Sequence, residues 1–236
     1  SLNLGTHVGD VLADVQANRA VLQRALGVRP VFLEQVHGMQ VQTLVLDTPD
    51  GAVADACLST QTGVACTIMV ADCLPILLCD ASGTWVAAAH AGWRGLAGQG
   101  GVGVVESTLA AVDASNRALA PVDAALAAPK VIAWLGPCIG PTAFEVGDEV
   151  RQAFVDGSPA AADCFVPVGP GKWWANLPAL ARQRLGAAGV SAVYGNAVQQ
   201  GIPMALALFG ERGLALHVAP VALHGLVMLT LFTLLS

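Results

Sequence analysis

The apolar positions of this 236-residue chain change their spacing along its length. Over residues 11–26 they recur at helical intervals and stop at Gly27, which predicts a helix with Asp10 as its N-cap. Short apolar runs bounded by turn residues follow, at 30–36, 41–46, 64–70, 75–79 and 84–89. These runs predict strands, and because a run such as 64–70 does not alternate, both faces of its sheet should be covered.

The second half of the chain is predicted to add mainly helices. Helical spacing returns at 96–112, 143–155 and 177–188, whereas residues 131–135 are typical of a buried strand. The Ala/Pro-rich stretch 114–129 favours a surface loop or insertion, although alanines can equally extend a helix. Since no internal repeat is present, we expect one domain over residues 1–236, with a mixed α+β fold in layers.

The segment 213–236 is apolar, uncharged and long enough to be a candidate membrane span. However, His217, Pro220 and His224 interrupt it, and no basic cluster flanks it. We therefore favour a buried C-terminal segment and expect no membrane association.

Charge and cysteine usage narrow the function classes. The net charge of −6, the pI near 5.2 and the lack of a Lys/Arg run disfavour binding to nucleic acid or anionic lipid. With 55% hydrophobic and only 12% charged residues, apolar surface must be hidden in a core or an oligomer interface, which is consistent with a homodimer. Six cysteines without CxxC pairing favour a reducing, cytoplasmic location.

Polar residues gather in three short segments at the ends of predicted strands. They are 35–38 (Gln-Val-His-Gly), 71–75 (Ala-Asp-Cys-Leu-Pro) and 90–95 (His-Ala-Gly-Trp-Arg-Gly). Rigid scaffolds usually present functional side chains at strand ends and in the loops after them, so we expect the three segments to converge.

These segments supply two imidazoles and one thiol, from His37, Cys73 and His90. Such a set suits zinc, and three protein ligands leave the fourth tetrahedral position for water or substrate, as in catalytic sites. A single histidine is more often a satisfied core or turn residue, but three candidate ligands together favour a metal. Copper is the alternative ion on ligand grounds.

Other polar residues of the chain are candidates for binding substrate. The glycine-rich loop after His90 leads into a predicted helix, whose free N–H groups, with Arg94 and Arg19, could hold a phosphate. Glycine-rich turns are also common for purely steric reasons. Asp72 could orient a ligand histidine or shuttle a proton, or it could simply stabilise a turn.

In order and spacing these segments resemble the YfiH-type polyphenol oxidase/laccase-domain family. The resemblance extends over residues 1 to about 195 and includes 1–5 (Ser-Leu-Asn-Leu-Gly), Asn18-Arg19, 136–141 (Gly-Pro-Cys-Ile-Gly-Pro) and 144–147 (Phe-Glu-Val-Gly). Family members usually have more sequence before the first motif, and their closing Cys-Thr, aromatic-Ser-x-Arg-Arg and Gly-Arg-x-Ala segments have no counterpart after Asn196.

The resemblance implies an α/β/β/α-layered fold and a zinc ion bound by His37, Cys73 and His90. It also implies phosphorolysis of adenosine, inosine, guanosine and methylthioadenosine, together with adenosine deamination. Asn18 and Arg19, which lie in a shared motif, join Arg94 and Asp72 as substrate-binding candidates. The older family name implies copper-dependent phenol oxidation, and bacterial members are also linked to peptidoglycan editing.

Three alternatives to a zinc-dependent nucleoside enzyme stay open. A multicopper laccase spends about ten histidines on its copper sites, whereas this chain has five. Cys73 could instead be a nucleophile activated by His37 or His90, as in a hydrolase or acyltransferase. A zinc-stabilised interaction module would need a fourth protein ligand, and none adjoins the three segments.

Overall fold

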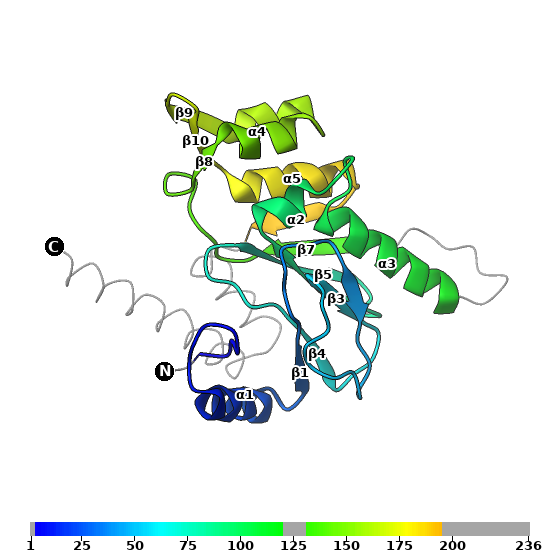
Figure 1. Ribbon diagram of the computed structural model, residues 1–236. Coiled ribbons are helices and arrows are strands. Elements are labelled where there is room, and N and C mark those ends of the chain that lie inside the picture. Colours follow the sequence, from blue (N-terminus) through cyan, green and yellow to red (C-terminus); the bar gives the residue numbers. More distant parts are fainter. Residues whose placement is uncertain (1–2, 120–130, 195–236) are drawn as a thin grey trace. The chain divides into compact units, whose positions relative to one another are not determined.

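The computed structural model describes residues 3–119 and 131–194 (Figure 1). Residues 1–193 form one compact unit, and the second unit, 194–236, lies outside the described residues except for Tyr194. The prediction of one domain over the whole chain stays a prediction, and so does the expectation for the apolar tail 213–236. Among the described residues, no helix has the length and apolar character needed to cross a bilayer.

A six-stranded mixed sheet forms the centre of the first unit, in the order β11-β7-β5-β6-β3-β2. Its strands are β2 (Val41–Thr43), β3 (Ala56–Ser59), β5 (Leu74–Asp80), β6 (Val86–Ala91), β7 (Val131–Leu135) and β11 (Ser191–Tyr194). The central strand β5 runs antiparallel to both β6 and β7. Leu74, Ile76 and Leu78 of β5 alternate with less buried residues and point into the main core, because successive side chains of a strand face opposite sides.

Helices cover one face of this sheet, and a second, smaller sheet covers part of the other (Figure 1). The helices are α2 (Trp93–Ala97), α3 (Val104–Leu119) and α5 (Leu177–Ala187). The second sheet pairs β1 (Arg29–Phe32) with β4 (Val64–Thr67) in parallel, and α1 (Leu12–Leu26) packs beside β1. The layers are therefore α/β/β/α, as the family resemblance implies.

The non-alternating apolar runs are explained by this layering. Cys57 of β3 and Ala88 of β6 face the second sheet, where they form a small core with Val31 and Val64. Their strand neighbours, such as Ala89, belong to the main core under the helices. Because both faces of the sheet are buried there, successive residues of these strands are all apolar and do not alternate with polar residues.

A three-stranded antiparallel sheet completes the first unit, in the order β8-β10-β9. Its strands are β8 (Glu145–Gly147), β9 (Phe165–Gly169) and β10 (Lys172–Ala175). Between β8 and β9 the chain forms the helix α4 (Asp148–Val155) and the 3₁₀-helix η1 (Pro159–Cys164). The predicted helix 143–155 is wrong at its start, because residues 145–147 pair with β10 and the helix begins only at Asp148.

Two other helix predictions need correction. The predicted helix 96–112 is divided, because Gly98, Gly100 and Gly101 adopt positive φ angles and a turn bridges Gln99 and Val102, so that α3 begins only at Val104. That helix then continues to Leu119 through part of the predicted loop 114–129, whose remainder lies outside the described residues.

The first helix does not begin at the predicted residue. Its N-cap is Val11, which makes no capping side-chain bond, and Asp10 Oδ1 accepts a hydrogen bond from the Val11 N–H. The predicted C-terminal end is correct: Gly27 adopts the left-handed conformation that often ends helices.

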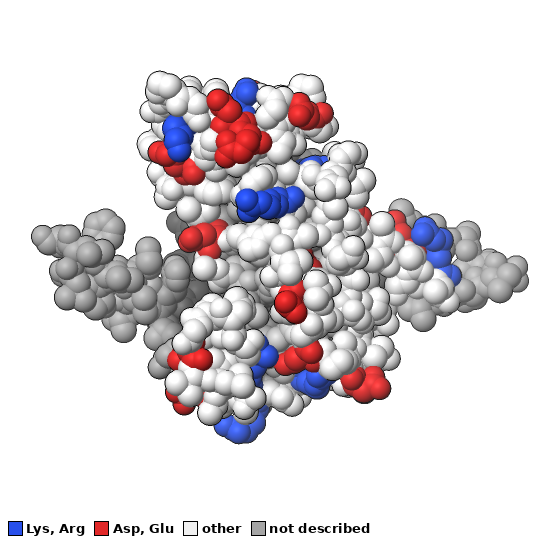
Figure 2. Space-filling model, viewed as in Figure 1, with Lys and Arg blue, Asp and Glu red and all other residues white. Residues whose placement is uncertain are grey.

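On the face shown in Figure 2, basic and acidic side chains are interspersed, and the described residues form no continuous basic patch there. This distribution agrees with the low expectation for nucleic acid binding, which stays a prediction.

Candidate metal centre

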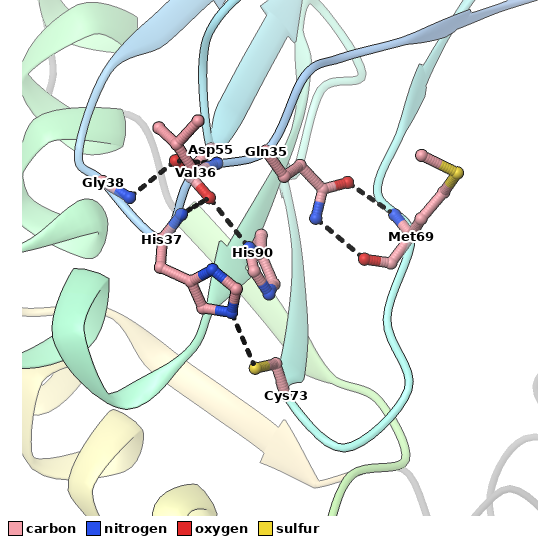
Figure 3. A network of polar contacts seen from close by, with 8 residues as sticks. All are labelled: Gln35, Val36, His37, Gly38, Asp55, Met69, Cys73 and His90. Atoms are coloured by element: carbon pink, nitrogen blue, oxygen red, sulfur yellow. Dashed lines mark hydrogen bonds and ion pairs between the residues drawn. The ribbon is translucent and has the colours of Figure 1, made fainter. Parts of the chain in front are cut away.

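The ends of two neighbouring strands and one turn bring His37, Cys73 and His90 together (Figure 3). The pairing of β5 with β6 places Pro75 opposite His90, so Cys73, two residues before Pro75, lies beside the end of β6. His37 comes from the turn between β1 and β2. One possible ligand atom from each of the three residues lies within 4.8 Å of the other two.

One pair of these atoms has the spacing that a shared metal ion requires. Tetrahedral bonds of zinc to nitrogen and sulfur imply ligand atoms roughly 3.3–3.8 Å apart. His37 Nε2 and Cys73 Sγ are 3.7 Å apart, and the rings of His37 and His90 meet edge to face with centroids 4.6 Å apart. No further His, Cys, Asp or Glu of the described residues joins the group.

The open side of the group faces a cavity of about 710 Å³. His37, Cys73 and His90 line it together with Asn3, Leu4, Gly5, His7, Val8, Gln35, Thr67, Ile68, Met69, Val70, Ala71 and Asp72. Gln35 holds one wall in place, since its side-chain amide donates to the Met69 carbonyl and accepts from the Met69 N–H, both at 2.8 Å (Figure 3). Cavities of this size are typical of small-molecule sites.

Asp55 is the carboxylate that contacts a ligand histidine, and the sequence analysis missed it. The side chain is fully buried, and its Oδ1 lies 2.8 Å from His90 Nδ1. It also accepts hydrogen bonds from the N–H groups of Val36, His37 and Gly38, at 3.1, 2.8 and 2.6 Å. The one local signal was an acidic residue inside an otherwise apolar stretch directly before β3.

These contacts set the charges of the centre. Burial opposes ionisation of Asp55, but the bonds from His90 and the backbone N–H groups hold the pKa of its carboxyl below the ordinary value. Burial also disfavours the imidazolium form of His90, yet the bonds to Asp55 and Cys73 outweigh it and raise its pKa to about 9. The pKa of His37 is lowered, first by burial and then by the neighbouring His90.

Packing explains two glycines after His90, one at the N-cap of α2 and one within that helix. A Cβ atom on Gly92 would lie 2.7 Å from His37 Cδ2 and 3.1 Å from Cys73 Sγ. A Cβ atom on Gly95 would lie 2.7 Å from the carbonyl oxygen of Gly38. These two positions are therefore glycine because the start of α2 lies against the turn that carries His37.

Two of the predicted substrate-binding residues, Arg94 and Asp72, lie outside the group of candidate metal ligands. Arg94 is exposed, stacks 4.5 Å above the Trp93 ring, and lies near enough to His37 for its charge to contribute to that residue's lowered pKa. Asp72 is exposed in the cavity lining and is not the carboxylate that orients His90. Its part in proton transfer stays a prediction.

Asn18 and Arg19 do not line the cavity but hold the chain segment that does. Asn18 Nδ2 donates to the Asn3 carbonyl at 2.9 Å, and Arg19 Nε donates to the Leu4 carbonyl at 2.8 Å. Arg19 also pairs with Asp50 at 3.1 Å. The structure gives these two residues a supporting position, and their predicted contact with substrate stays a prediction.

A model of the family described as multi-copper polyphenol oxidoreductase laccase matches residues 1–200. The chain belongs to this family. Among its curated relatives, purine nucleoside phosphorylase PA4543 of Pseudomonas aeruginosa is 50% identical over 197 residues, covering 83% of this chain and 74% of the relative. Purine nucleoside phosphorylase YfiH of Escherichia coli is 45% identical with the same coverage. The YfiH-type resemblance is thus confirmed.

Solved structures of similar proteins agree. Protein NMB0706 of Neisseria meningitidis is 46% identical and superposes with a TM-score of 0.69, covering 83% of this chain and 74% of that one. YlmD of Geobacillus stearothermophilus is 28% identical with a TM-score of 0.68, covering 85% and 77%. The family description mentions several copper ions, whereas the described residues of this chain hold one group of three candidate ligands.

Proposed function

We propose that this chain is a zinc-dependent purine nucleoside phosphorylase that also deaminates adenosine. The observation that carries the proposal is the open His37–Cys73–His90 group on a cavity of about 710 Å³. Two relatives named purine nucleoside phosphorylase, at 50% and 45% identity, support the substrate class. The proposed nucleosides are adenosine, inosine, guanosine and methylthioadenosine, and the proposed protein is a cytoplasmic homodimer.

Each polar group has a proposed task. His37, Cys73 and His90 hold the zinc ion, which when bound supplies a Lewis acid beside the cavity. The cavity walls orient the nucleoside, and Arg94 holds phosphate for attack on the ribose C1′ atom. Asp72 lines the cavity next to Cys73 and moves a proton to a nitrogen of the departing purine.

A second candidate function uses Cys73 as a nucleophile. It is favoured by the 3.7 Å contact between Cys73 Sγ and His37 Nε2, which a general base would also make. The two functions differ in what they leave on the protein, since a nucleophile forms a covalent adduct with substrate and a metal ligand does not.

Metal analysis combined with product identification tests the proposal. We expect about one zinc ion per chain, as a three-ligand catalytic site implies. Adenosine with phosphate should yield adenine and ribose 1-phosphate, and without phosphate it should yield inosine. A chelator should abolish both reactions, and added zinc should restore them.

Two other outcomes would establish a different function. Full activity in metal-free protein, with a covalent adduct on Cys73, would establish the nucleophile function. Phenol oxidation with bound copper would establish the laccase function.

Replacement of Arg94 with lysine should weaken the use of phosphate. A guanidinium offers paired donors that an ammonium cannot reproduce, so we expect the KM for phosphate to rise about tenfold. Deamination needs no phosphate and should change less than about twofold. Steady-state kinetics of both reactions measure the difference.

The control is Arg117→Lys, because Arg117 is also exposed but lies near the end of α3. It should leave both reactions unchanged. A parallel loss of phosphorolysis and deamination in Arg94→Lys would show that Arg94 only supports the loop.

A further inference from the structure

The position of Asp55 is fixed by the backbone on both sides of it. Its N–H donates to the Gln40 carbonyl at 3.0 Å, and its own carbonyl accepts from the His90 N–H at 2.7 Å. The side chain is completely buried directly before β3. A buried carboxylate in such a place needs partners, because removing its charge from water is costly.

Three of its partners are consecutive backbone N–H groups of one turn. His37, at the centre of the turn, has a φ of 61°, which is uncommon for a residue other than glycine. Consecutive N–H groups in a turn of this kind can converge on a single anion. The bonds to Val36, His37 and Gly38 therefore hold the strained backbone that aims the His37 ring at Cys73 (Figure 3).

The fourth partner is the side chain of the other histidine. Because an ionised carboxylate only accepts hydrogen bonds, the 2.8 Å contact assigns the proton to Nδ1 of His90. When Nε2 gives up its proton, as metal binding requires, it carries a lone pair on the side of Cys73 and His37. The same oxygen, Oδ1, accepts from the His37 N–H, so that both histidines depend on one atom.

We propose that Asp55 is the positioning residue of the metal centre, and that it orients both histidines at once. It selects the tautomer of His90 and holds the backbone of His37, which aligns the two rings before a metal arrives. This inference rests on the metal-binding part of the proposed function and does not depend on the reaction.

Asp80 provides a matched comparison within the same sheet. It is a buried carboxylate, 5% exposed, at the end of β5, and it accepts from the N–H groups of Thr84 and Trp85 and from the hydroxyl groups of Ser82 and Thr84. None of these partners belongs to the candidate metal centre. A variant of Asp80 therefore measures the cost of disturbing a buried carboxylate without disturbing the ligands.

The test compares Asp55→Asn with Asp80→Asn in the full chain. Asparagine keeps the shape of aspartate and can still accept from His90, but its amide group must then face the N–H groups of the turn. We expect the zinc dissociation constant, measured by competition with a chromophoric chelator, to rise about 10- to 100-fold in Asp55→Asn. It should stay within about twofold of the wild type in Asp80→Asn, although both variants melt at lower temperature.

Cobalt(II) provides a spectroscopic readout that a loss of stability alone would not change. The ligand-field bands of the cobalt-loaded protein should shift in Asp55→Asn, because the geometry of the two imidazoles changes, and should match the wild type in Asp80→Asn. Equal zinc affinities and identical cobalt spectra in the two variants would overturn the proposal.

Gly38→Ala gives a second route if Asp55→Asn does not fold. Its Cβ would lie 3.3 Å from Asp55 Oδ2 and would displace the carboxylate without removing it, whereas Gly186→Ala meets no atom within 4 Å and is the control. We expect weaker zinc binding in Gly38→Ala alone, and an unchanged dissociation constant would overturn the proposal. If the wild type itself bound no zinc, the metal centre of the proposed function would be refuted. That result differs from the failure of the Asp55 proposal, in which the wild type binds zinc and the variants bind it equally well.

Discussion

Replacement of Cys73 with serine should remove the bound zinc and the nucleoside activities together. Cys73 is the only thiol among the three candidate ligands, and its Sγ lies 3.7 Å from His37 Nε2. A serine hydroxyl is a poor substitute for a thiolate, because it is not ionised at neutral pH and binds zinc weakly. Since the ion is proposed to supply several kcal/mol of transition-state stabilisation, phosphorolysis should fall at least about 100-fold.

Cys79→Ser is the matched control for this prediction. Cys79 is partly buried and lies near the far end of β5, and it is not one of the candidate ligands. Zinc content measured by mass spectrometry and product formation should both stay near the wild-type values in this variant. If Cys73→Ser lost its activity but kept the full amount of zinc, the cysteine would act in catalysis without holding the metal.

The convergence of the three candidate ligands could be predicted from sequence because it depends on local patterns. Cys73 directly precedes one apolar run and His90 stands near the end of the next, and antiparallel pairing brings the start of the first strand beside the end of the second. The apolar runs also indicated that the sheet is covered on both faces. These inferences require only the spacing of apolar residues and the places where it is interrupted.

Asp55 could not be predicted in the same way, because its role depends on contacts distant in sequence. It bonds to residues 17 to 19 positions before it and to His90, 35 positions after it. A single aspartate before a short strand is equally typical of an ordinary turn. Its function follows only from its burial and its partners, which the sequence does not contain.

The short strand β8 could not be predicted either, because it too depends on a partner distant in sequence. β8 has three residues, and its pairing with β10 rather than any local preference makes residues 145–147 extended. The glycines at 98, 100 and 101 were visible in the sequence, but the predicted helix 96–112 included them. Their positive φ angles separate α2 from α3.

Replacement of Gly92 with alanine should disrupt the metal centre while leaving the fold intact. The φ and ψ angles of Gly92, −67° and 160°, are ordinary for alanine, so the backbone itself tolerates the change. The added Cβ would nevertheless lie 2.7 Å from His37 Cδ2 and 3.1 Å from Cys73 Sγ. The His37 ring cannot retreat easily, because the bonds of its turn to Asp55 fix its backbone.

The two ligands should therefore be pushed apart by several tenths of an ångström. Because small displacements of catalytic groups are costly, we expect phosphorolysis to fall about 100-fold and zinc to bind more weakly. Gly169→Ala is the control, since Gly169 in β9 also has an ordinary backbone and meets no atom within 4 Å. Circular dichroism should show both variants folded, with zinc affinity and turnover reduced only in Gly92→Ala. Wild-type zinc affinity in folded Gly92→Ala would mean that His37 and Cys73 do not bind the metal together, which would contradict the proposed centre.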